Sequence, residues 1–322
     1  MISFVDNAIC RNQKIMRKYV SLFSLTVCFI IVLVFVIKPG VAQKASVQKV
    51  IWQIGKADNS IAEFALAPSG YENFLAKDFG WEDNFFLVGK SEEKKDWPYA
   101  LPGPEDRWGG TAPLAGWHAA VLNILFDIDK LPGQGNWELI IDMLDMSADK
   151  PPLFKVMLNG KSWKYQLPKG SGDSTLKGQQ TKHRGQIIKI PVNTKLLKKG
   201  GNEITLTSLS GSWLAFDQVR MEGPKDAHLS TPKQALIRDV AAAGYETEDS
   251  GKRAQPLLVD VQHISGNPGI AVFLDHSEIF EKTLDTGRYM FEVPMPAVTS
   301  AKKSYYEIKV DGHLIQSGYV KR

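Results

Sequence analysis

The stretch Phe154–Gln166, FKVMLNGKSWKYQ, decides the fold class of this chain. Two segments of strand length, Phe154–Leu158 and Ser162–Gln166, flank the pair Asn159-Gly160. Asn and Gly both tolerate the positive φ angles of a type I′ turn, so the pair predicts a two-residue β-hairpin.

The same β pattern extends in both directions from this hairpin. Apolar runs of strand length are separated by turn residues, and Gly200-Gly201 precedes one of them. These runs include Ala120–Ile128, Trp137–Met143, Gln186–Val192 and Asn202–Leu209. Roughly eight to ten short strands with almost no helical periodicity indicate an all-β domain, and residues 43–224 are predicted to form a jelly-roll β-sandwich.

A second β segment follows at residues 256–322. Its short apolar runs and the hairpin pair Asp311-Gly312 predict a small immunoglobulin-like or fibronectin-like β-sandwich. Between the two sandwiches, residues 225–255 are predicted to be a linker with a short helix. That helix is expected at Lys233–Ala243, because Thr231-Pro232 supplies an N-cap and a proline at the first position, and Gly244 ends it.

Residues 1–42 have the features of a leader. A basic stretch precedes an uncharged, mostly apolar run at residues 19–37, and Gly40-Val41-Ala42 suits signal peptidase cleavage before Gln43. The alternative is an uncleaved anchor, since the run nearly reaches the ~20 residues that span a bilayer. In both cases we expect export to the periplasm, the cell surface or the medium.

The charge of the chain changes once the leader is set aside. The leader holds five of the 39 Lys and Arg residues and one of the 35 acidic residues, which leaves 34 of each. We therefore expect no nucleic-acid partner, and membrane contact only through residues 19–37 if they are uncleaved. Both cysteines, Cys10 and Cys28, lie in the leader, so the exported part is held by its core without disulfides.

Three segments of the jelly-roll region resemble a known family. They are Ile51–Asp58 (IWQIGKAD) with Glu63-Phe64 after it, the run Asn202–Leu209, and Gly211–Glu222 (GSWLAFDQVRME). Together they resemble the jelly-roll, carbohydrate-binding-module-like domain of rhamnogalacturonan lyases, polysaccharide lyase family 4, over about residues 47–224. The resemblance implies a jelly-roll fold and a polysaccharide or oligosaccharide partner.

The chain differs from that family in the position of this domain along the sequence. In the family the domain follows a catalytic β-sandwich and a fibronectin-like domain, whereas here it follows the leader directly. The lysine–histidine pair to which the family's lyase chemistry is attributed belongs to the catalytic domain and has no matching segment here. The resemblance therefore implies a fold and a substrate class and does not extend to the reaction.

A sugar site needs aromatic rings for stacking and polar side chains for hydroxyl groups. All eight tryptophans lie between Trp52 and Trp213, and we expect most of them in the core. The long irregular stretch Ser91–Gly116 is expected to form an ordered loop over the sandwich. The candidate carbohydrate-binding residues in and beside it are Trp97, Tyr99, Arg107, Trp108 and His118, together with Glu105 and Asp106. The alternative is that they only fix the loop, with Arg107 paired to Asp106 or Glu105.

Two further candidate groups are weaker. Lys182 and Arg184, on either side of His183, would suit an acidic uronate, although short basic runs are usually solvated surface. Asp58, Glu63 and Asp217 could hold one structural Ca²⁺ through their carboxylates, or serve only as turn and edge residues.

No catalytic constellation is evident. Adjacent residues of a strand point to opposite faces, so Lys182, His183 and Arg184 do not form one acid–base group. Asp106 and Asp217 are only a nominal carboxylate pair. We expect an exported, non-catalytic carbohydrate-binding or accessory protein in pectin or rhamnogalacturonan breakdown. The alternatives are the N-terminal part of a larger polysaccharide lyase or glycoside hydrolase, and rhamnogalacturonan lyase activity in this chain itself.

Overall fold

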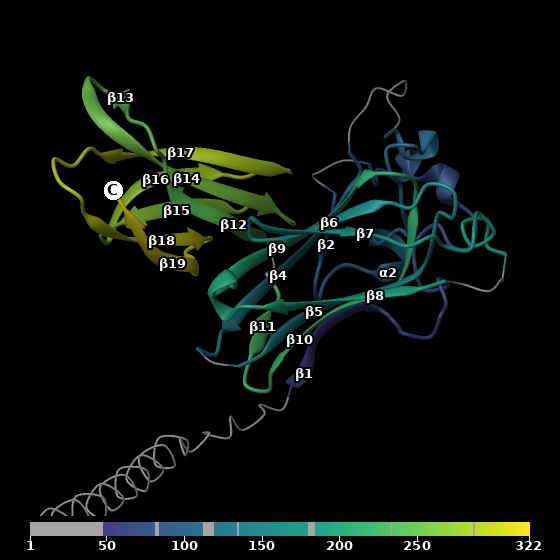
Figure 1. Ribbon diagram of the computed structural model, residues 1–322. Coiled ribbons are helices and arrows are strands. Elements are labelled where there is room, and N and C mark those ends of the chain that lie inside the picture. Colours follow the sequence, from purple (N-terminus) through teal and green to yellow (C-terminus); the bar gives the residue numbers. More distant parts are fainter. Residues whose placement is uncertain are drawn as a thin grey trace, which may run out of the picture. The chain divides into compact units, whose positions relative to one another are not determined.

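The computed structural model of the protein describes residues 48–80, 84–111, 119–133, 135–179, 184–232, 234–285 and 287–322. The leader predicted at residues 1–42 lies outside this part of the chain. Within it, no helix is long and apolar enough to cross a membrane. Strands make up most of the regular secondary structure in this part of the chain (Figure 1), which confirms the all-β prediction.

Eight strands form the jelly-roll, in two sheets that enclose one core. The first sheet has the order β1–β10–β5–β8 and the second has the order β4–β9–β6–β7, with all these neighbours antiparallel. The strands are β1 (Gln48–Gly55), β4 (Val121–Lys130), β5 (Trp137–Met146), β6 (Leu153–Leu158), β7 (Lys161–Gln166), β8 (Gln186–Val192), β9 (Gly200–Ser210) and β10 (Leu214–Pro224). Two interleaved four-stranded sheets of this kind are the jelly-roll arrangement, so that prediction is confirmed.

Short elements complete the jelly-roll. β2 (Phe85–Leu87) runs parallel to β4, β3 (Ala100–Leu101) pairs with the start of β10, and β11 (His228–Ser230) pairs with the end of β4. The short helical turns are η1 (Tyr71–Asn73), η2 (Leu75–Lys77), α2 (Glu93–Asp96), η3 (Arg107–Gly109) and η5 (Thr194–Leu196).

The predicted hairpin joins β6 to β7. Asn159 and Gly160 have φ angles of 47° and 86°, the left-handed values that the turn requires. On β6, Phe154, Val156 and Leu158 are fully buried and the residues between them are not. This alternation places one face of β6 on the jelly-roll core.

The small sandwich has the strand order expected of a fibronectin-like domain. One sheet is β12–β14–β17 with β13 added along β14, and the other is β16–β15–β18–β19. Its strands are β12 (Ala235–Ala242), β13 (Thr247–Asp249), β14 (Lys252–His263), β15 (Gly269–Leu274), β16 (Ser277–Thr283), β17 (Arg288–Pro296), β18 (Lys303–Val310) and β19 (His313–Lys321). An aliphatic core lies between the sheets, and the Asp311-Gly312 turn joins β18 to β19 as predicted.

The helix predicted at Lys233–Ala243 is wrong. Residues Ala235–Ala242 form β12, which pairs antiparallel with β14 and so begins the small sandwich inside the segment assigned to a linker. Ala235 and Ile237 face the small core, whereas Leu236 packs with Leu87 and Leu125 of the jelly-roll. Because both faces of this strand are covered, its apolar run has no two-residue alternation and could not be told from a helix.

The contact between the sandwiches also contains a buried ion pair. Arg238, on β12, has a side chain only 3% exposed and pairs with Glu203 of β9. Lys198 pairs with Asp239 at 2.6 Å, and a Cβ at Gly201 would collide with the Ile237 carbonyl. The two sandwiches therefore meet in a close-packed, charge-paired interface along β12.

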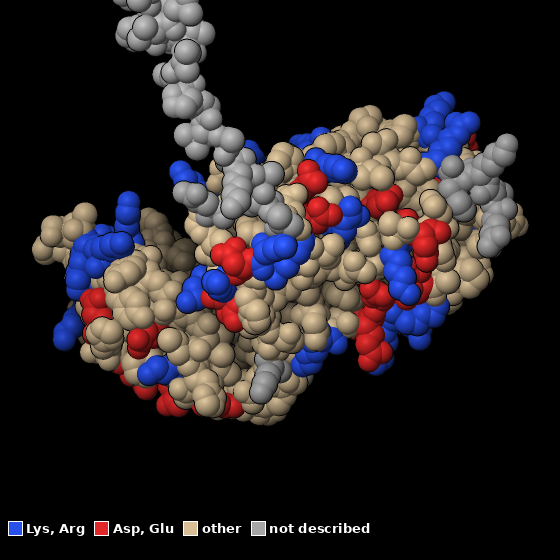
Figure 2. Space-filling view, turned by 90° about the horizontal axis from the view of Figure 1, so that it is seen from below, with Lys and Arg blue, Asp and Glu red and all other residues tan. Residues whose placement is uncertain are grey.

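The exterior carries charges of both signs. On the face shown in Figure 2, Lys and Arg side chains alternate with Asp and Glu across both sandwiches. This distribution matches the equal counts of acidic and basic residues in residues 43–322.

Candidate functional site

The loop at residues 91–111 covers one end of the jelly-roll beside the turn between β9 and β10. Glu105 N donates to the Gly211 carbonyl at 3.1 Å, which ties the loop to that turn. Trp97 and Tyr99 point inward: Trp97 is 1% exposed against Phe86 and Phe216, and Tyr99 is fully buried with its hydroxyl donating to the Leu176 carbonyl. Neither ring can stack on a sugar, so the structure contradicts that role for them.

Asp106 organises the exposed half of the loop. Its carboxylate accepts from Gly103 N at 2.8 Å and from the Ser212 hydroxyl at 2.6 Å, and the Trp108 side chain also hydrogen-bonds to it. Burial raises the pKa of Asp106 to about 6 against the opposing effect of these donors. The loop is thus built around a carboxyl that holds a proton more tightly than a solvated aspartate does.

Trp108 lies in η3 and is only partly buried. Its ring meets Tyr71 edge-on, with centroids 5.2 Å apart and an interplanar angle of 79°, and meets Phe74 in the same way at 5.7 Å. Tyr71 is also partly buried, and burial raises the pKa of its hydroxyl. A partly exposed indole held by two edge-on rings is a rigid apolar surface of the kind that sugar rings contact.

Asp173 adds an exposed carboxylate beside these rings. It accepts from Trp213 Nε1 at 3.1 Å, and its charge contributes to the raised pKa of both Asp106 and Tyr71. We call Tyr71, Asp106, Arg107, Trp108 and Asp173 the loop-end cluster. At its surface it combines an aromatic ring with the carboxylate of Asp173 and one exposed guanidinium, which are the groups that hold sugar hydroxyls and carboxylates.

The predicted pairing of Arg107 with Asp106 or Glu105 is not what the structure has. Glu105 pairs instead with Lys150, at 2.8 Å between Oε2 and Nζ, and Asp106 is occupied by neutral donors. Arg107 is exposed in η3. Its side chain therefore lies at the surface, next to Trp108 in the chain.

Sequence reasoning missed Tyr71 and Asp173. Tyr71 lies in η1 and Asp173 in the connection from β7 to β8, and only the fold brings them beside residues 91–111. In the sequence, the signal for this site is the tryptophan and proline content of residues 91–111. His118 and Lys182 lie outside the described residues, and Arg184 is exposed just before β8.

The structure gives each of the predicted calcium ligands Asp217, Asp58 and Glu63 a role within the protein: Asp58 lies close enough to Asp217 to act on its pKa, and Glu63 accepts a backbone hydrogen bond. Asp217 is 3% exposed and accepts from Ser60 N at 3.2 Å; burial raises its pKa to about 6, and the Asp142 and Asp58 charges add to this. Glu63 accepts from Lys56 N at 2.9 Å. Among the described residues no three His, Cys, Asp or Glu side chains are grouped to hold a metal, so backbone carbonyls would have to complete the site. The Ca²⁺ site stays a prediction.

Comparison with known proteins identifies the jelly-roll. Residues 50–221 match the family described as CBM-like, polysaccharide lyase family 4, domain III, which confirms the resemblance of residues 47–224. A rhamnogalacturonate lyase of Dickeya dadantii (strain 3937) is 30% identical over 184 residues, which is 53% of this chain and 27% of that protein. The chain thus matches about a quarter of the length of this relative.

Solved structures give weaker likenesses. A GH2 beta-galacturonidase from Eisenbergiella tayi is 10% identical, with 66% of this chain and 37% of that chain covered and a TM-score of 0.24. A beta-glucuronidase from an uncultured Clostridium sp. is 13% identical, with 87% and 45% covered and the same TM-score of 0.24. TM-scores this low support no conclusion about the fold or the function.

Proposed function

Since this chain belongs to the CBM-like family of polysaccharide lyase family 4, domain III, we propose that it is an exported carbohydrate-binding protein, non-catalytic in this chain, that assists polysaccharide breakdown. The observation that carries the proposal is the match itself, because it coincides with the jelly-roll, β1 to β10. The named relative acts on rhamnogalacturonate, so we take pectin-type polysaccharides as the ligand class.

The loop-end cluster is the binding site we propose within that domain. Trp108 would lie against the C–H face of a sugar, while the exposed Asp173 carboxylate accepts from its hydroxyls and the buried Asp106 holds the loop in shape. Arg107 would pair with the carboxylate of a uronate residue, which a guanidinium binds through two hydrogen bonds. These roles use the partly exposed side chains and leave Trp97 and Tyr99 in the core.

The test is isothermal titration of the protein with rhamnogalacturonan, homogalacturonan and a neutral galactan. We expect heat of binding with at least one pectin-type polymer, and a loss of affinity of about tenfold in Trp108→Ala. Trp108→Phe keeps an aromatic ring between Tyr71 and Phe74, so it should bind more tightly than the alanine variant. Tyr319→Ala removes a 62% exposed ring on β19 and serves as the matched control.

Ultraviolet absorbance, recorded during the same titrations, separates binding from lyase activity. A lyase leaves an unsaturated uronate at the new chain end, which absorbs in the ultraviolet. Heat without a rise in absorbance supports the proposal, and a rise would make this chain an enzyme. Binding that is equal in wild type and Trp108→Ala would exclude the loop-end cluster as the site.

A further inference from the structure

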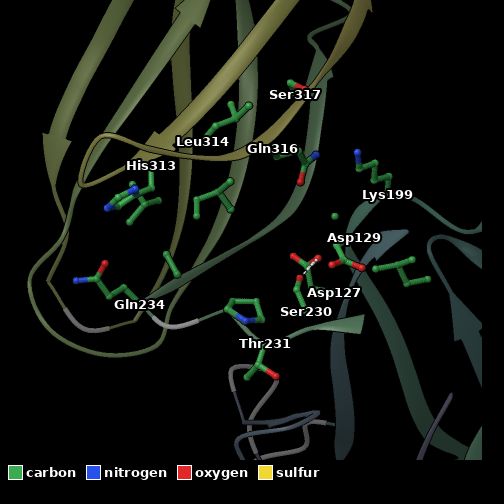
Figure 3. A pocket seen from close by; sticks show the side chains of 16 residues that line it. Asp127, Asp129, Lys199, Ser230, Thr231, Gln234, His313, Leu314, Gln316 and Ser317 are labelled. Atoms are coloured by element: carbon green, nitrogen blue, oxygen red, sulfur yellow. Dashed lines mark hydrogen bonds between the residues drawn. The ribbon is translucent and has the colours of Figure 1, made fainter. Parts of the chain in front are cut away.

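A cavity of about 560 Å³ lies between the jelly-roll and the small sandwich. Its wall comes from the end of β4, the start of β9, the segment from β11 to β12, and β19. Figure 3 shows Asp127 and Asp129 with Lys199 and Gln316 above them, and Gln234 and His313 on the other side. The volume falls within the range of small-ligand pockets, which often form where two domains meet.

The walls of this cavity are held in place. Arg238 and Glu203 fix β12 against β9 next to it, and the Asp127 carboxylate accepts from the Ser230 hydroxyl at 2.7 Å. Asp129 Oδ1 lies 2.7 Å from His228 Nδ1. A cavity framed by such contacts is preformed, so a ligand would not have to order it.

The polar groups in the wall are of mixed charge. Asp127 and Asp129 supply carboxylate acceptors, whereas Lys199 and His313 supply nitrogen donors. Gln316 donates from Nε2 to the Tyr306 hydroxyl, and its Oε1 is buried with no hydrogen-bond donor among the described residues. Gly200 (φ +98°) makes room for that amide, because a Cβ there would lie 3.0 Å from Oε1.

This combination selects one class of ligand. Two carboxylates beside the cavity disfavour a phosphate or another compact polyanion, because like charges repel in a confined site. They suit several hydroxyl groups, while Lys199 suits a single carboxylate. Pro232 and the 54% exposed Leu314 offer apolar contact for C–H groups.

We propose that the cavity is a second sugar site, which binds the uronic acid of a mono- or disaccharide. The inference rests on the proposed carbohydrate-binding function but uses different residues. The loop-end cluster and the cavity lie at opposite ends of β9, whose 11 residues span roughly 35 Å. A short product would fit the cavity, while a polymer would bind at the loop-end cluster.

The test is an NMR titration of the protein with galacturonate, digalacturonate, galactose and inorganic phosphate. We expect the two uronates to bind more tightly than galactose, and phosphate not to compete. Lys199→Met should weaken uronate binding by about tenfold and change galactose binding little. Asp129→Asn should weaken both sugars, and Lys321→Met, an exposed lysine on β19 outside the cavity, is the matched control.

The outcomes separate this inference from the proposed function. Uronate binding that depends on Lys199 and Asp129 supports the cavity site, even if no polymer binds the protein. Equal binding of galacturonate in wild type, Lys199→Met and Asp129→Asn would overturn it, even if polymer binding depends on Trp108. Competition by phosphate would also overturn it, since the cavity would then bind anions without regard to the sugar.

Discussion

In both sandwiches of this protein the core lies between two sheets, but the connections between the strands differ in length. The jelly-roll has long loops that carry buried polar groups such as Asp106 and Thr111, and its core contains Trp97, Trp137 and Trp213. The small sandwich joins its strands mostly by short turns, and its core is mainly aliphatic. Long loops can gather side chains from distant segments at one point, whereas short turns leave the polar groups on the strands. We therefore expect recognition in the jelly-roll, with the small sandwich acting mainly as the wall of the cavity.

The largest effect is expected when a buried ring is removed from the jelly-roll core. Trp213→Ala should lower the free energy of unfolding by about 3–5 kcal/mol, because a fully enclosed indole is lost and Asp173 loses its donor. Chemical denaturation followed by tryptophan fluorescence measures the change. Leu257→Ala, in the core of the small sandwich, is the counterpart. If the Leu257 variant moved the jelly-roll transition as far as Trp213→Ala does, the two cores would not be separate units.

The second test breaks the contact between the sandwiches. Arg238→Ala should lower the free energy of unfolding by about 3 kcal/mol, since it leaves the Glu203 and Asp260 carboxylates without this buried partner. Calorimetry should then show the unfolding transitions of the two sandwiches further apart in temperature than in wild type. Lys198→Met removes the exposed pair with Asp239 and should change stability by no more than about 0.5 kcal/mol. A single unchanged transition in Arg238→Ala would show that the interface does not depend on this ion pair.

The sequence predicts most of the strands and both hairpins, because their turn residues act locally. It fails at β12, where Leu236 and Arg238 face the jelly-roll and Ile237 faces the small core. A run of apolar residues does not show whether one face or both faces of the strand will be buried.

The candidate site shows the same limit. The loop was identified from its composition, and Trp108 and Arg107 do lie at its surface. The inward direction of Trp97 and Tyr99, and the approach of Tyr71 and Asp173, depend on packing between segments far apart in the chain. Such contacts exist only in the folded protein, so residue patterns alone could not rank these side chains.

A smaller effect concerns pH and the buried carboxyl of the long loop. The pKa of Asp106 is raised to about 6, so its contribution to stability is full below its unfolded value near 4 and is lost as the pH rises through 6. The free energy of unfolding of wild type, relative to Asp106→Asn, should therefore fall by about 2 kcal/mol between pH 4 and pH 7. Denaturant titrations at several pH values measure this difference. Asp226→Asn, an exposed position, should give a flat difference, and a flat difference for Asp106→Asn as well would refute the prediction.

The smallest effect compares the two hairpin turns directly. Gly160 (φ +86°) and Gly312 (φ +75°) both have open space where a Cβ would lie, so alanine brings only backbone strain, about 1 kcal/mol in each. Gly133→Ala, which also meets open space but without a positive φ, should not destabilise the protein. Thermal unfolding of the three variants measures the losses of stability.

Equal losses of stability at 160 and 312 would mean that the two sandwiches differ in their loops and cores and not in their turns. A clearly larger loss at 160 would mean that the bonds from the Asn159 amide to Asn202 and to the Leu196 carbonyl depend on that turn, and would make this hairpin part of what holds the start of β9 beside the cavity.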